Sequence, residues 1–437
     1  MATKDIAIEI RENVLTFFNK NIEKCLSAFI EAEDPELSNI YTSKQIDFIN
    51  LIKNADILIL TANKYETNIL HKSINNISQR KIVKCTYQVN HIDYNVFFFH
   101  WGQYYCAHVM ASSTGSNTIN GSEDMVRMMF AIKEFNPLVV LSFGICFGIN
   151  HSKQNLCDVI ISDKVYSYGV GIKIRDSKVI ISDDNNFQIS ENLKNKIKEL
   201  YRENSLSTRN GEFFRHYITG EVVVSNEEFK QAIIQQIGID RGILAGEMEG
   251  YGIFKECKKY GKTGDGSQPV SCIIVKSICD WGAEKNDFFA KSDGNSTDYE
   301  LENMPSIDHQ KLYESIAQVY KQKDTVLPKS IKSSKAMEEL IKDSIQAFAA
   351  QCAFDTCNKI VVSSSMVFGM TPYCYICDVL QNLKDEGDCI IEAINLKNYI
   401  KKDAPRLTDN DIDDIISELI QEGKISTKDN KGFHAII

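Results

Sequence analysis

The sequence lacks the features that mark several large classes of protein. No apolar run reaches the roughly 18 residues that a membrane-spanning helix needs. A positive charge excess is also missing, because 49 Lys and Arg stand against 59 Asp and Glu and give a net charge of −10. This balance argues against general binding to nucleic acid or to anionic membranes. Residues 1–13 are polar and amphipathic, unlike a signal peptide. Together these absences predict a cytoplasmic protein without a membrane partner.

Motifs for cofactors and metals are missing too. The sequence has no P-loop, and Gly144-x-x-x-Gly148 is not the dinucleotide-binding fingerprint. Its 8 histidines form no HExxH pattern, and Cys374-x-x-Cys377 lacks the second pair that a zinc site needs. The 13 cysteines follow no disulfide framework, which suits free thiols in a reducing compartment. We therefore expect neither a cofactor nor a bound metal.

What the sequence does contain is an alternation of apolar, strand-length runs with amphipathic helical segments. The segment Ala55–Ala62 contains the continuous apolar run Ile57–Leu60, as in strands that are buried on both faces. Residues 81–102 alternate around a turn and predict a hairpin. This rhythm predicts an α/β fold with a mixed sheet. Further strands are expected over 105–111, 138–148, 158–165 and 217–225, and helices over 125–135, 226–237 and 337–360.

Composition divides the chain into three parts. Residues 1–54 place apolar side chains at three- and four-residue steps and predict a helical lead-in. Residues 55–360 hold the alternating pattern, interrupted at about 284–335 by a polar insertion that we expect to be partly ordered at best. Residues 366–437 predict a winged helix, with helices over 376–383, 390–400 and 409–422 and a hairpin over 423–437.

Acidic residues gather where apolar strands end. A strand that begins at Ile243 leads through Glu247 and Glu249 into a helix, and a second apolar strand ends at Asp280. Carboxylates at strand ends of an α/β sheet are where chemistry is usually done. Each glutamate alone could be an ordinary acid at a helix N-terminus, where the helix dipole favours it. The pairing of both with Asp280 favours a functional site.

These residues carry a resemblance to a known family. The segment Gly246-Glu-Met-Glu-Gly250, followed about thirty residues later by Val275-Lys-Ser-Ile-Cys-Asp-Trp281, resembles the signature of the nucleoside phosphorylase superfamily. Within it the chain is most similar to the methylthioadenosine/S-adenosylhomocysteine nucleosidases, which also have a glutamate at the place of Glu66 after the run Ile59-Leu-Thr-Ala62. The resemblance implies a three-layer fold around a central mixed, twisted sheet. It also implies cleavage of the bond between ribose and a purine.

The resemblance further implies roles for individual residues. Asp280 matches the acid that addresses N7 of the leaving purine, and its apolar neighbours predict a raised carboxyl pKa. Glu66 matches the base that activates water. Glu249 matches the carboxylate that accepts both ribose hydroxyls, with Met248 as an apolar floor under the sugar and Glu247 as a supporting acid. Structural readings stay open: a turn-capping Asp280, a solvated Glu66 at a helix start, and a Met248 packed in the core.

The sequence departs from the family pattern around the base. Val223 stands where the family places an aromatic residue that stacks on the base. Phe147, beside Cys146, stands where the family has glycine, which points to a relocated aromatic wall. Cys279 replaces a serine and Lys276 replaces an arginine. We expect Val223, Phe147 and Cys146 to line a base pocket that is similar in kind.

The nature of the reaction leaves alternatives. Phosphorylases of this family carry Arg and Ser where this chain has Ser142 and Ile145, and arginine is the usual phosphate clamp. Hydrolysis of a purine nucleoside or nucleotide, with adenine compounds preferred, is therefore favoured over phosphorolysis. Three alternatives remain: an AMP- or ATP-cleaving effector in bacterial defence or signalling, a phosphate-dependent nucleoside phosphorylase, and a non-catalytic nucleoside sensor.

The charge of the C-terminal part indicates which kind of partner it binds. Residues 375–437 carry 13 acidic and 8 basic side chains, whereas a DNA-reading domain needs a basic surface. We therefore expect DNA binding to be absent and a protein partner to use this part of the chain. Because the family often forms dimers or hexamers, the resemblance also implies a homo-oligomer.

Overall fold

The computed structural model describes residues from all three predicted parts of the chain. These are 3–33, 40–42, 55–77, 82–89, 92–102, 104–110, 131–135, 137–168, 172–175, 178–181, 186–202, 214–220, 224, 227–237, 242–259, 270–282, 309–328, 334–363, 367–369, 391–392, 397–398, 409–421, 425–428 and 432–435. No helix in this described part is both long enough and apolar enough to cross a membrane.

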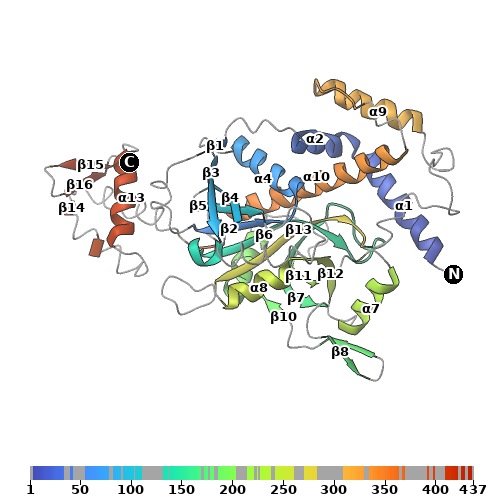
Figure 1. Cartoon of the computed structure of the whole chain (residues 1–437), viewed down its shortest axis with the longest axis horizontal. Helices are drawn as coiled ribbons and strands as arrows, with labels where there is room; N and C mark the ends of the chain where they lie inside the picture. The colour runs from blue at the N-terminus through green and yellow to red at the C-terminus, as the bar shows by residue number, and fades with distance from the viewer. Residues whose placement is uncertain are drawn as a thin grey trace.

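A sheet of 11 strands forms the centre of the molecule (Figure 1). Its strands are β1 (Ile40–Thr42), β2 (Ile57–Thr61), β3 (Ile82–Val89), β4 (Ile92–Trp101), β5 (Tyr104–Met110), β6 (Val139–Gly148), β7 (Val159–Ser167), β10 (Asn186–Gln188), β11 (Phe214–Thr219), β12 (Ile243–Glu247) and β13 (Ser271–Asp280). The order is β1-β3-β4-β5-β2-β6-β12-β11-β7-β10, with β13 paired to both β6 and β7. Strands β3 and β4 form the antiparallel hairpin predicted for 81–102. The mixture of parallel and antiparallel pairs confirms the predicted α/β class.

Five strands of this sheet close into a ring. β6 pairs with β12, β12 with β11, β11 with β7, β7 with β13, and β13 again with β6. The register sets Gly246 at the end of β12 opposite Phe147 at the end of β6, and Asp280 at the end of β13 opposite the same phenylalanine. β2 runs parallel to β6 and ends beside it. The acidic strand ends that the sequence singles out therefore meet at one edge.

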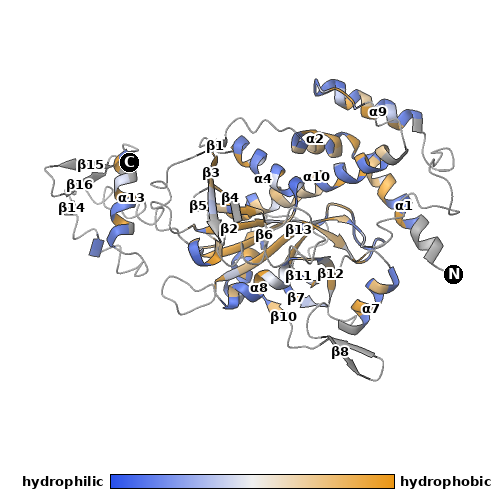
Figure 2. Cartoon of the chain, in the orientation of Figure 1, coloured by the Kyte–Doolittle hydropathy of each residue, from blue (hydrophilic) through white to orange (hydrophobic). Residues whose placement is uncertain are grey.

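Helices cover both sides of the sheet (Figure 1). They are α1 (Thr3–Lys20), α2 (Ile22–Glu33), α4 (Lys64–Ile77), α6 (Glu191–Arg202), α7 (Glu227–Ile237), α8 (Gly250–Lys259), α9 (His309–Gln322) and α10 (Ser334–Val361). Ile57 and Ile59 of β2 pack with α4 and α10, whereas Leu58 and Leu60 belong to the apolar cluster on the opposite side. Period-two alternation in a strand produces this division. Figure 2 shows the strands as mainly hydrophobic and the covering helices as mixed.

Several described elements differ from the predicted ones or add to them. Residues 40–42 of the predicted helical lead-in form β1, which pairs in parallel with β3. Within the polar insertion, residues 309–322 form the ordered helix α9, whose Leu312, Ile316 and Val319 are buried. Burial of one apolar face stabilises a helix that composition alone did not suggest. The strand predicted over 217–225 begins earlier and ends at Thr219.

The C-terminal part has a three-stranded antiparallel sheet of its own. It consists of β14 (Ile391–Glu392), β16 (Gly432–Ala435) and β15 (Ile425–Lys428), in that order. β15 and β16 form the predicted hairpin, and α13 (Asp409–Gln421) is the predicted third helix. Residues 391–392 were expected to be helical and instead form a strand, because they pair with β16. The helix predicted over 376–383 lies outside the described residues.

Candidate active site

Glu66 sits at the corner where β2 passes into α4. Its backbone N–H donates to Asn63 Oδ1 at 3.1 Å, and its carboxylate reaches back to accept from the N–H of Asn63 at 3.3 Å. This reciprocal pair is a capping box, with Asn63 in the place of the usual Ser or Thr. The same carboxylate oxygen accepts from the N–H of Ala62 at 2.5 Å. The fold of the helix start therefore fixes the position of the predicted base.

The second oxygen of Glu66 points to β6. Oε1 accepts from the N–H of Ile145 at 2.9 Å, and the carboxylate lies directly against Gly144. A Cβ atom on Gly144 would overlap the carboxylate, and Gly144 has φ +148°, a conformation that L side chains rarely adopt. Glu66 itself is only 1 % exposed. The alternative of a solvated Glu66 at a helix start is therefore wrong, because the side chain packs inward against the sheet.

Burial decides the protonation of Glu66. It raises the pKa of this carboxyl to about 7, although the Lys276 charge and the N–H donors of Ala62 and Ile145 favour the ionised form. A carboxyl that titrates near neutrality can both hold and release a proton at working pH. This is the property that a general base requires.

Replacing Gly144 by alanine should separate Glu66 from its donors. The methyl group needs the space of the carboxylate, so we expect kcat to fall at least ~10-fold, since small misplacements of reacting groups are costly. Gly242→Ala is the matched control, because Gly242 also has a positive φ (+66°) but no atom within 4 Å of a built Cβ. Steady-state kinetics of both variants checks this. Equal kcat values in the two variants would mean that the missing side chain of Gly144 is not needed to position Glu66.

A buried lysine joins the predicted acids into one cluster. Lys276 of β13 is 1 % exposed, and its Nζ lies 2.5 Å from Glu249 Oε2 and 3.3 Å from Glu247 Oε2. Its charge also acts on Glu66. Glu247 accepts in addition from the N–H groups of Glu249 and Gly250, each at 2.9 Å. Burial alone would lower the pKa of Lys276, but the three glutamates outweigh it and raise that pKa.

The two glutamates of this cluster differ in protonation. Burial raises the pKa of Glu247 to about 6, with the Lys276 charge acting against it and the Glu249 charge adding to it. For Glu249, burial is outweighed by the Lys276 ammonium, which lowers the pKa below its ordinary value. Its side chain keeps 21 % of its surface exposed. The Glu249 carboxyl therefore favours its ionised form and is partly exposed, whereas Glu247 is buried.

Removing the lysine should destabilise the fold. Lys276→Met leaves two buried carboxylates without their cation, and we expect the free energy of unfolding at pH 8 to fall by about 3 kcal/mol. The loss should shrink toward pH 5, because folded-state carboxyls whose pKa is raised take up protons there. Urea denaturation at both pH values measures this. Lys276→Arg keeps the charge and should lose much less; an equal loss would contradict the charge argument.

Asp280 lies at the end of β13, in a tight turn. Its Oδ1 accepts from the N–H of Gly282 at 2.7 Å, and the Cys279 thiol donates to Oδ2 at 3.3 Å. The following residue is anchored from two sides: Lys230 of α7 donates to the Trp281 carbonyl at 2.7 Å, and the indole N–H donates to Asn13 Oδ1 at 3.2 Å. Asp280 thus caps a turn and is also held on a fixed segment.

The residues expected to line the base pocket differ in their burial and surroundings. Phe147 is buried, its ring packed against Gly246 and Gly282 in a cluster with Tyr166 and Tyr168. Cys146 is buried too, within electrostatic reach of Lys276, Asp280 and Glu247. Met248 is half-buried between the two glutamates. Val223 lies outside the described residues.

Three side chains at this site were not among the residues predicted to form it. The sequence marks Lys276 only as a substitution for arginine. Tyr168 lies close enough to Glu247 and Glu249 for their charges to raise its pKa further above the effect of burial. Phe229 of α7, 43 % exposed, meets Tyr168 edge-on with ring centroids 6.5 Å apart. An exposed phenylalanine inside an amphipathic helix gives no signal in a single sequence, since only the fold shows which face is open.

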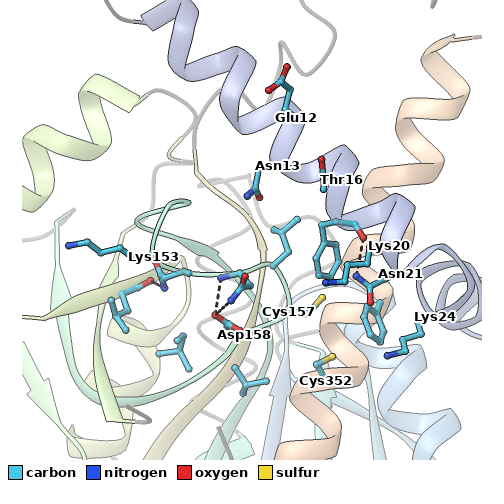
Figure 3. Close-up of a pocket in the computed structure, with 18 of the residues that line it drawn as sticks. Glu12, Asn13, Thr16, Lys20, Asn21, Lys24, Lys153, Cys157, Asp158 and Cys352 are labelled. Atoms are coloured by element: carbon cyan, nitrogen blue, oxygen red, sulfur yellow. Dashed lines mark hydrogen bonds between the residues drawn. The ribbon is translucent and has the colours of Figure 1, made fainter. Parts of the chain in front are cut away.

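A pocket of about 840 Å³ lies elsewhere, between α1, the segment 153–160 and α10 (Figure 3). Its wall includes Lys20, Lys24 and Lys153 but none of the acids described above. A large pocket is usually the first candidate for an active site. Here the interacting buried acids lie outside it, and perturbed ionisable groups mark function more directly. We therefore place the candidate site at the carboxylate cluster.

A family model of known proteins matches most of the part of the chain that holds the large sheet. The sequence profile of the phosphorylase superfamily matches residues 56–304, more than half of the chain. This range contains Glu66, Glu247, Glu249, Lys276 and Asp280, and it excludes α1 and α2.

Individual relatives are distant. A death domain-containing ATP nucleosidase from Amphimedon queenslandica is 26% identical over 164 residues, which cover 33% of this chain and 29% of that protein. The chain thus aligns with less than a third of that relative. A methylthioadenosine/S-adenosylhomocysteine nucleosidase of Neisseria meningitidis, solved with methylthio-immucillin-A, is 13% identical with a TM-score of 0.41, covering 70% of this chain and 98% of its own. Futalosine hydrolase of Helicobacter pylori is 12% identical with a TM-score of 0.43 and the same two coverages.

Proposed function

This chain belongs to the phosphorylase superfamily, and from that membership we propose that it hydrolyses the bond between ribose and the base of a purine nucleoside or nucleotide. The observation that carries the proposal is the buried cluster of Glu66, Lys276, Glu249 and Glu247 at the strand ends where Asp280 also lies. Cleavage of such a bond passes through an oxocarbenium-like sugar and calls for an acid at the leaving group and a base at the water.

We propose separate tasks for Glu66, Glu249 and Asp280. Glu66, with its pKa near 7, takes a proton from the attacking water. Ionised Glu249 uses one oxygen for Lys276 and offers its remaining lone pairs to the 2′ and 3′ hydroxyls of ribose. Asp280 gives its proton, or a hydrogen bond, to the departing base. Met248 packs under the sugar, and exposed Phe229 offers its face to the base.

Water is favoured over phosphate as the nucleophile. A phosphorylase has to hold a dianion beside the sugar, and arginine is the usual clamp. Here the cation that acts on Glu66, Glu247 and Glu249 is Lys276, and it is already engaged by two carboxylates. Ile145 stands where phosphorylases of the family carry a serine, and its N–H is taken by Glu66. These contacts support hydrolysis.

Adenine compounds are the proposed substrate class. The A. queenslandica relative is described as an ATP nucleosidase, so ATP and AMP stand beside adenosine, methylthioadenosine and S-adenosylhomocysteine as candidates. We expect chromatography to detect free adenine from at least one of these without phosphate. Release that requires phosphate would point to a phosphorylase. Tight binding without release of base would point to a nucleoside sensor.

The remaining parts of the chain fit a regulated enzyme. The winged-helix-like unit of 366–437 is proposed to bind a protein, since its hairpin and α13 belong to a net acidic region. A homo-oligomer is proposed as well. Light scattering of the full chain tests the oligomer directly, with a monomeric mass counting against it.

A further inference from the structure

A buried hydrogen-bond chain lies behind Glu66 and has no part in the steps above. Its four members are Thr67, Thr61, His108 and His71. The hydroxyls of Thr67 and Thr61 are 2.7 Å apart, Thr61 Oγ1 is 2.9 Å from His108 Nε2, and His108 Nδ1 is 3.0 Å from His71 Nε2. All four side chains are buried, with His108 at 0% and His71 at 1% exposed. Burying so many polar groups in a core costs free energy, so such a hydrogen-bond chain suggests a role beyond packing.

The hydrogen-bond chain links three elements, α4, β2 and β5, at the corner where β2 passes into α4. Thr67 and His71 lie one turn apart on α4, Thr61 is the last residue of β2, and His108 belongs to β5. It therefore leaves α4, crosses β2 and β5, and returns to α4. The backbone N–H that follows Thr61, that of Ala62, is the closest donor to the Glu66 carboxylate, and Thr67 directly follows Glu66. Both ends of the corner are thus tied to the sheet.

Both histidines are uncharged links in this chain. Burial lowers the pKa of His71 to about 3, and burial together with the neighbouring His71 lowers that of His108 well below its ordinary value. Phe97 packs on both rings, with centroids 4.4 Å from His71 and 5.7 Å from His108. A neutral imidazole offers one donor and one acceptor. His108 therefore donates from one ring nitrogen and accepts at the other, so its bonds to Thr61 and His71 join β5 to both β2 and α4 as a tether.

We propose that His71, His108, Thr61 and Thr67 are positioning residues that hold the β2–α4 corner so that the Glu66 carboxylate faces the attacking water. The proposal rests on the proposed function, since it assigns these side chains to the base of that reaction. The four side chains act on the carboxylate indirectly, through the N–H groups of Ala62 and Asn63 that they hold in place. Such supporting shells decide whether a site is held within the tolerance that catalysis needs.

Thr61→Val tests the tether with little change in shape. Valine keeps the β-branch that suits a strand but removes the hydroxyl that joins Thr67 to His108. We expect kcat to fall on the order of 10-fold with KM nearly unchanged. We also expect the Glu66 carboxyl to titrate on the order of one pH unit higher, because its N–H donors are held less well. The carboxyl is followed by ¹³C NMR of glutamate-labelled protein, with the signal assigned from Glu66→Gln.

Two variants serve as matched controls. Thr61→Ser restores the hydroxyl and should restore both readouts. Ser73→Ala removes another buried hydroxyl from α4, one that donates to Gln351 and lies outside the chain, and should change neither readout. If Thr61→Val does not fold, Thr67→Val opens the same chain from the helix side.

The outcomes separate two failures. If wild-type protein releases no base, the proposed function fails, but the Glu66 titration still decides the positioning role. A Glu66 pKa that moves in Thr61→Val and not in Ser73→Ala supports the tether. Wild-type titration and wild-type kcat in Thr61→Val would overturn the proposal.

Discussion

Glu66→Gln is expected to lower kcat on the order of 10³-fold, the middle of the range for loss of a general acid or base. The glutamine amide keeps the length of the side chain and can still accept from the N–H of Ile145, but it cannot take a proton from water. The wild-type enzyme should gain activity as pH rises through about 7, because the ionised carboxyl is the active form and burial raises its pKa to that value. The residual activity of Glu66→Gln should lack this rise. Stopped assays of base release between pH 5 and pH 9 measure both.

The control for this variant is another buried glutamate. Glu256 of α8 is 3% exposed and lies outside the carboxylate cluster. Glu256→Gln makes the same chemical change in a comparable environment, so its kcat should stay within about twofold of wild type. Equal losses in the two variants would mean that Glu66 matters only to the fold.

Sequence pattern was sufficient to predict most strands of the large sheet. The mainly apolar segments Ala55–Ala62 and 138–148 became β2 and β6, because strands buried on both faces have this composition. It did not reveal β1, a strand of three residues inside a helical segment, whose partner β3 begins about forty residues later. Nor did it reveal that five strands close into a ring, since β6–β12 and β7–β13 pairing depends on contacts across more than ninety residues.

The acids of the candidate site could be predicted from the sequence, whereas the groups that hold those acids could not. Glu66, Glu249 and Asp280 follow apolar strands and match the family motif, and the fold brings their elements to one edge. Two features that set their chemistry gave no local signal: the space beside Gly144 and the ion pairs of Lys276. Each joins residues far apart in the sequence, so its consequence for the pKa of a carboxyl could not be read from neighbours along the chain.

Asp280→Asn is expected to lower kcat for nucleosides by 10²- to 10⁴-fold while the fold stays intact, with both figures following from the usual range for a leaving-group acid. Asparagine can still accept from the N–H of Gly282 through its amide oxygen, so the turn survives, but it has no proton to give to the base. Asp158→Asn is the matched control. Asp158 also caps a turn, accepting from the N–H of Asn155 at 2.8 Å, and its variant should keep wild-type kcat.

The leaving group distinguishes an acid from a turn cap. A riboside whose leaving group departs as a stable anion, such as 4-nitrophenyl riboside, needs no proton, so Asp280→Asn should regain most of its activity on that substrate. Glu66→Gln should regain none, because water must still be activated. Loss of activity on both substrates in Asp280→Asn would leave Asp280 as the cap of the Gly282 turn. Recovery confined to Asp280→Asn would assign protonation of the leaving group to Asp280 and activation of water to Glu66. Only the departure of a base needs a proton, whereas the attack of water is needed with either leaving group.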